Sequence, residues 1–154
     1  MSRFGILQQQ YRDSEKNWSD HWDHLVLCAE ELADDFGLWL SRTESGHADQ
    51  LCPPIPVKAL GHLVDDESED VFKDNILTGA LGYTLNFAFE IRVSDGEHAK
   101  PPSVIRLKLA IDSTGEEMKV TVGKLGSNFL YRRNTVPENL FDELFNICKE
   151  ELSV

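Results

Sequence analysis

Apolar residues between positions 18 and 39 recur at alternating steps of four and three. This is the 3.5-residue period of a coiled-coil seam, and it places these side chains on one stripe of a single helix. Acidic residues such as Glu31 and Asp34 fall on the opposite side. We therefore expect an amphipathic helix over about residues 14–41, capped at Asp13 or Ser14. The stripe consists of Trp18, Trp22, Leu25, Ala29, Leu32, Phe36 and Trp39.

The pattern changes after this helix. Residues 43–56 contain a glycine and three prolines and are typical of a linker. Between about residues 57 and 133, apolar and polar residues alternate, which indicates β-strands. The runs 83–93, 105–111, 118–122 and 127–133 are joined by short connections. Such connections favour an antiparallel meander with one covered face.

A second amphipathic helix is predicted over about residues 136–152, because Pro137 follows Thr135 at a typical helix start. Its apolar face is broader than contact with one sheet requires. We expect an α+β fold in which long N-terminal and C-terminal helices flank the sheet and pack together. The residues predicted for the helix–helix or oligomer interface are Trp18, Trp22, Leu25, Leu32, Phe36, Trp39, Phe141, Leu144, Phe145 and Cys148.

The length and the charge of the chain limit the classes of function that it could have. A chain of 154 residues fits a single domain, 1–154. Its formal net charge of -12 argues against nucleic-acid binding and favours basic protein surfaces as partners. Three cysteines without paired spacing indicate a reducing compartment such as the cytoplasm. Since no apolar run suits a signal peptide or a membrane span, we expect no membrane insertion.

Candidate chemistry is sparse. Asp20, His21 and His24 form a weak metal candidate, because His21 and His24 lie one helical turn apart. Ligands from one helix rarely complete a tetrahedral site, so a solvated polar flank is the favoured interpretation. The chain has no GxSxG or GxGxxG motif. We expect a non-enzymatic protein without a cofactor.

Two charged groups of residues remain. An acidic run lacks the glycine and the closing glutamate of a calcium loop, so it is either a solvated loop or a landing site for a basic partner. Basic residues on the expected strands either form cross-strand salt bridges or make a separate basic patch. The acidic run is Asp65, Asp66, Glu67, Glu69 and Asp70, and the basic residues are Arg92, Arg106, Lys108 and Lys119.

The order of elements, with Leu85 to Val93 followed by a charged turn and Phe141-Asp142-Glu143-Leu144 in the last helix, resembles the mitochondrial acidic matrix protein family. That family is also called the mitochondrial glycoprotein family. The resemblance implies a homotrimeric acidic ring without established enzymatic activity. In a bacterial relative it implies binding of host complement or matrix proteins. The alternative is an acidic immunity protein, or a nucleic-acid mimic that inhibits a basic toxin or nuclease.

Overall fold

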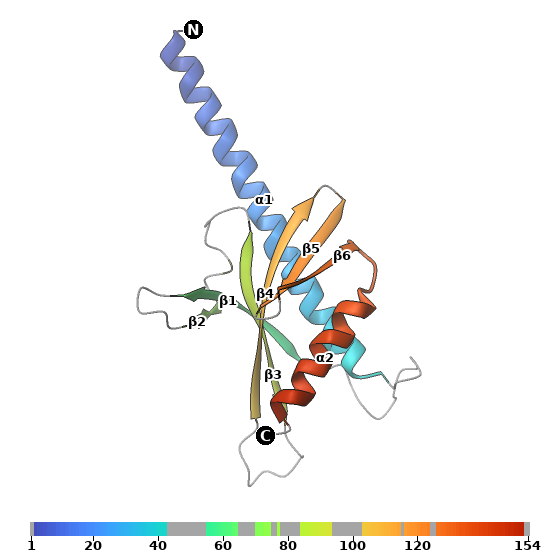
Figure 1. The fold of residues 1–154 in the computed structure, drawn as a ribbon. Helices are drawn as coiled ribbons and strands as arrows, with labels where there is room; N and C mark the ends of the chain where they lie inside the picture. The colour runs from blue at the N-terminus through green and yellow to red at the C-terminus, as the bar shows by residue number, and fades with distance from the viewer. Residues whose placement is uncertain are drawn as a thin grey trace.

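A computed structural model shows an N-terminal helix, a six-stranded antiparallel sheet and a C-terminal helix, as the α+β prediction requires (Figure 1). It describes residues 2–42, 55–64, 70–74, 77, 84–93, 103–114, 116–123 and 126–152. Most of the predicted linker and the predicted landing residues 65–69 lie outside this part. The elements are α1 (Arg3–Leu40), β1 (Val57–Val64), β2 (Asp70–Lys73), β3 (Leu85–Val93), β4 (Ser103–Thr114), β5 (Glu117–Val122), β6 (Ser127–Arg132) and α2 (Glu138–Leu152).

Helix α1 begins well before the predicted start, so the prediction of a cap at Asp13 or Ser14 was wrong. The side chain of Ser2 caps the helix by accepting a hydrogen bond from the Gly5 amide at 3.0 Å. The following residues include leucine, glutamines and arginines, which favour helix, so nothing forces a later start. The predicted end holds, because Ser41 follows α1 as its C-cap and donates its hydroxyl to the Leu38 carbonyl.

The sheet has the strand order β2-β1-β3-β4-β5-β6, and all neighbours are antiparallel. Strands β3 to β6 follow one another as the predicted meander. Strand β1 lies between β2 and β3, so the first two strands form a hairpin added to the edge of the meander. Alternate residues such as Phe89 and its partner Leu107 therefore share the face that the helices cover.

The core lies between this sheet face and the two helices. The Phe36 ring of α1 stacks on Phe89 of β3 at 5.8 Å between centroids, and it contacts Phe141 of α2 at 5.2 Å. The Trp39 ring adds contacts with Phe141 at 5.9 Å and with Phe145 at 5.8 Å. Large aromatic rings fill the junction, so α1 and α2 pack together over the sheet, as predicted.

Gly37 fixes the point where the chain enters the sheet. The Ile55 amide donates to the Gly37 carbonyl at 3.1 Å, just before β1 begins. A Cβ atom on Gly37 would lie 2.0 Å from the Ile55 carbonyl oxygen, which is far inside contact distance. The close approach of two backbones therefore requires glycine at this position.

Candidate interaction surfaces

Helix α1 has two parts with different surroundings. We call residues 3–17 the arm and residues 22–40 the embedded part. The embedded part packs on the sheet, whereas the arm projects beyond it (Figure 1). Trp22 is 5% exposed and Phe36 is 0% exposed, but Phe4 is 68% and Tyr11 is 65% exposed. Among the residues that the structure describes, the buried positions of this helix begin at Trp22.

The arm continues the apolar stripe of the embedded part. Phe4, Leu7 and Tyr11 are separated by steps of three and four, and Trp18 follows Tyr11 after seven residues. They therefore lie on the side of α1 that the embedded part turns toward the sheet. The predicted helix of residues 14–41 did not include these three residues, although the same period predicts them. The polar positions Ser14 and Glu15 interrupt the pattern before Trp18.

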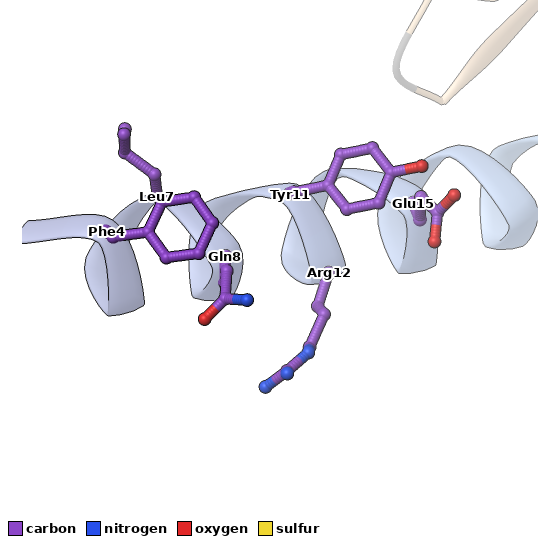
Figure 2. A pocket seen from close by; sticks show the side chains of 6 residues that line it. All are labelled: Phe4, Leu7, Gln8, Tyr11, Arg12 and Glu15. Carbon is purple, nitrogen blue, oxygen red and sulfur yellow. The ribbon is translucent and has the colours of Figure 1, made fainter.

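A shallow depression runs along this stripe. Figure 2 shows that the side chains lining it, from Phe4 to Glu15, all come from one helix. A single helix cannot enclose a small molecule, so the stripe suits an extended partner rather than a compact ligand. A hydrogen bond with Glu15 raises the pKa of Tyr11, which leaves this phenol neutral at physiological pH.

Most residues predicted for a helix–helix or oligomer interface are inside the protein. Trp22, Leu25, Leu32, Phe36, Phe141, Leu144 and Cys148 belong to the core. Trp39 and Phe145 are half-buried at the junction of the two helices, and the half-buried Trp18 stacks on His21. Burial raises the pKa of the Cys148 thiol to about 11 and also raises that of Cys28, so both thiols stay protonated.

The outer faces of the two helices are acidic. Exposed carboxylates follow the side of α1 opposite the core, and α2 carries a second set. Arg42 and Lys149 are the basic residues of the stretches 18–42 and 138–152. The exposed carboxylates are Asp20, Asp23, Glu30, Asp34, Asp35, Glu138, Asp142, Glu150 and Glu151.

One groove concentrates this charge where α1 meets the turn between β6 and α2. Its lining includes Asp34, Asp35 and Asn134. Glu31 lies at one side of the groove and forms a bidentate ion pair with Arg133, in which Nη2 donates to Oε1 at 2.9 Å and Nε donates to Oε2 at 3.2 Å. This ion pair lowers the pKa of Glu31. Loss of solvent around Asp35, together with the charges of Glu31 and Asp34, raises the pKa of Asp35. The charge of Arg42 partly offsets this rise, but within the part of the chain that the structure describes neither Asp34 nor Asp35 forms a salt bridge.

The open face of the sheet carries the predicted cross-strand salt bridges. Arg106 pairs with Glu90 at 3.2 Å, and Arg92 reaches the same carboxylate at 3.7 Å. Asp70 accepts a hydrogen bond from Lys108 and lies 2.9 Å from His62, contacts that lower the pKa of Asp70. Asp70 is therefore the first residue of β2 rather than a loop residue, and its carboxylate contacts both Lys108 and His62.

The predicted metal candidate is dispersed over the surface of α1. Asp20 is exposed, His21 stacks on Trp18 at 6.5 Å, and His24 lies 3.8 Å from the Cys28 sulfur. In the described part of the chain, no group of three or more His, Cys, Asp or Glu residues is arranged to hold a metal ion. Within the same part, no helix is long and apolar enough to cross a membrane.

No protein-family model, curated protein or solved structure matches this chain. The resemblance to the mitochondrial acidic matrix protein family therefore stays a prediction.

Proposed function

We propose that this protein is a non-enzymatic, self-associating adaptor that binds basic protein surfaces through the acidic outer faces of its helices. The distribution of charge carries the proposal. From residue 18 onward, the exposed sides of α1 and α2 hold nine carboxylates, namely those listed above, whereas the basic residues of the stretches 18–42 and 138–152 are Arg42 and Lys149. On the open sheet face, by contrast, Glu90 and Asp70 are paired with basic side chains. A basic partner is therefore attracted to the helices rather than to the sheet.

The groove beside Arg133 is the best defined part of this surface. The ion pair with Arg133 holds Glu31 in place, while Asp34 and Asp35 stay at the surface. The raised pKa of Asp35 means that its ionised form is destabilised by partial burial and by the neighbouring carboxylates. A cation from a partner would stabilise that ionised form. A lysine or arginine of the partner suits this position.

A matched pair of charge variants tests where the partner binds. The helix variant replaces Glu30, Asp34 and Asp35 by the corresponding amides and leaves Glu31 unchanged, so that the ion pair with Arg133 survives. The loop variant replaces Asp65, Asp66 and Glu67 in the same way, which changes the net charge equally. The probe is a synthetic lysine- and arginine-rich peptide, whose affinity is measured by calorimetry at low and high salt.

We expect the helix variant to bind the peptide about tenfold more weakly at low salt, because three exposed charges contribute about 1.4 kcal/mol together. The difference should shrink at high salt, where surface charges are screened. The loop variant should lose much less. Equal losses in both variants would mean that net charge alone attracts the peptide, and a larger loss in the loop variant would return the landing site to residues 65–69.

An inhibitor of a basic toxin or nuclease would use the same carboxylates, since Asp34 and Asp35 lie in a groove that can imitate paired phosphates. A gene for such a toxin next to the gene of this protein would favour that function. Inhibition that disappears in the helix variant would support it directly.

A further inference from the structure

We infer that the arm of α1 binds the arm of a second copy of this chain, with the two helices antiparallel. The inference rests on the self-association proposed above but not on the binding of basic partners. It assigns self-association to Phe4, Leu7 and Tyr11, which no residue of the described body covers, and it gives the assembly two-fold symmetry. That symmetry differs from the three-fold ring that the family resemblance implies.

Pairing with a second copy would stabilise the arm itself. An isolated helix of about 15 residues is marginal in water, and the arm differs from one only in that it continues the embedded part of α1. The arm is helical from Arg3, yet Phe4, Leu7 and Tyr11 are each more than 60% exposed. A second arm would cover these side chains and stabilise the helix at the same time. The period of the stripe, with Phe4, Tyr11 and Trp18 seven residues apart, is that of a helix that packs on another helix.

The charge of the arm also favours contact between two copies. The arm has three basic residues, Arg3, Arg12 and Lys16, and two acidic residues, Asp13 and Glu15, whereas the whole chain has a net charge of -12. The arm is therefore the segment through which two copies can approach with the least repulsion. Contact through the acidic outer faces of the helices would bring like charges together instead.

Charge also sets the orientation. The tip of the arm is positive, because it carries Arg3, has no acidic residue in the first turn and contains the positive end of the helix dipole. The inner end is negative, with Asp20 and Asp23 beside the acidic body. An antiparallel pair places each tip beside the inner end of its partner and keeps the two bodies at opposite ends. A parallel pair would set the bodies side by side.

The length of the arm fits this arrangement. Residues 4 to 18 span about 21 Å at 1.5 Å per residue. Antiparallel overlap over this length lays Phe4 near Trp18 of the other copy and ends where the buried part of α1 begins at Trp22. A pair this short buries less area than most stable dimers, so we expect a dissociation constant in roughly the micromolar range.

Neighbouring positions on the arm give a matched test. Leu7→Glu places a charge in the stripe, whereas Ile6→Glu places the same charge about 100° away around the helix. Ile6 is 48% exposed, so the control also replaces an exposed apolar residue. Sedimentation of the full chain over a series of concentrations measures the mass of the assembly, and circular dichroism checks that the body remains folded.

We expect the wild type and Ile6→Glu to pass from one chain to two chains as concentration rises, and Leu7→Glu to require at least tenfold more protein. A single chain at every concentration would overturn the inference, as would equal effects of both substitutions or a mass of three chains. If the protein stays a single chain but binds anionic lipid vesicles through Leu7, the occupant of the stripe is a membrane surface instead. Unchanged binding of the basic peptide by Leu7→Glu would show that the proposed partner site is separate.

Orientation is measured with a spin label at Gly5→Cys, in a chain whose Cys52 is replaced by serine. Cys28 and Cys148 are buried and have raised pKa values, so they react slowly with the label. The antiparallel pair predicts a label-to-label distance of about 20 Å or more, from the helical rise between the two labels. Moving the label seven residues along nearly the same side of the helix, to Arg12→Cys, separates the two orientations. The antiparallel pair predicts a clearly shorter label-to-label distance at Arg12, which lies near the middle of the overlap, whereas a parallel pair keeps the two distances similar and would overturn the inference.

Discussion

Residues 3–17 and residues 22–40 belong to one helix and share one apolar period, but the protein covers only the second set. In the embedded part, the rings of Phe36 and Trp39 meet aromatic rings of the sheet and of α2. In the arm, Phe4 and Tyr11 lie on the same side of the helix but beyond the described body, so they are exposed. An apolar stripe on a helix therefore indicates that another surface packs on it. Whether that surface belongs to the same chain depends on how the rest of the chain folds.

The largest expected difference between the two parts comes from removing one aromatic ring in each. Phe36→Ala should lower the free energy of unfolding by about 4 kcal/mol, because it empties a fully buried position between β3 and α2. Phe4→Ala should change it by less than about 0.5 kcal/mol in dilute protein, where the arm is unpaired. Urea titration at low protein concentration measures both, and similar losses would contradict the division of α1 into two parts.

A smaller difference is expected from the two glycines of α1. Gly37→Ala should destabilise the protein by about 2 kcal/mol, because the new methyl group collides with the Ile55 carbonyl and outweighs the better helix propensity of alanine. Gly5→Ala should leave the unfolding midpoint of the body nearly unchanged. The same titration compares them. A neutral Gly37→Ala would mean that the entry into β1 can shift away from α1.

The smallest effect concerns pH. The ion pair with Arg133 lowers the pKa of Glu31, so this contact stabilises the fold above the unfolded pKa of about 4.3 and the contribution is lost as pH falls through the folded value. Both side chains are more than a third exposed, so we expect about 0.5 kcal/mol. Glu31→Gln should lower stability at neutral pH and have little effect in acid. A loss that is equal at both pH values would rule out the ion pair as the cause.

The sequence predicts the fold well where a local period carries the information. Alternation in 85–93 and 105–111 identifies the central strands, and the breadth of the face containing Phe141 and Phe145 predicts that α2 also meets α1. The predicted start of α1 was wrong because Ser2, Asp13 and Ser14 are all residues that can cap a helix. A local pattern does not rank them.

The candidate surfaces are harder to predict, because they depend on which side chains the fold brings together. The acidic run included Asp70, but pairing of β2 with β1 places its carboxylate beside His62, and Lys108 of β4 reaches it as well. The pairing of Arg133 with Glu31 joins residues about a hundred positions apart in the chain. The exposed arm was also missed, since periodicity shows a stripe without showing how much of it the body covers.

The most direct test of the two roles of α1 is amide hydrogen exchange at low and at high protein concentration. It shows whether the embedded part packs within one chain while the arm packs on a second chain. We predict that residues 22–40 are protected equally at both concentrations, because the sheet and α2 cover them within one chain. Residues 3–17 should exchange rapidly in dilute protein and become protected at high concentration, when arms pair. Protection of the arm that does not change with concentration, or an arm that never becomes protected, would contradict this account.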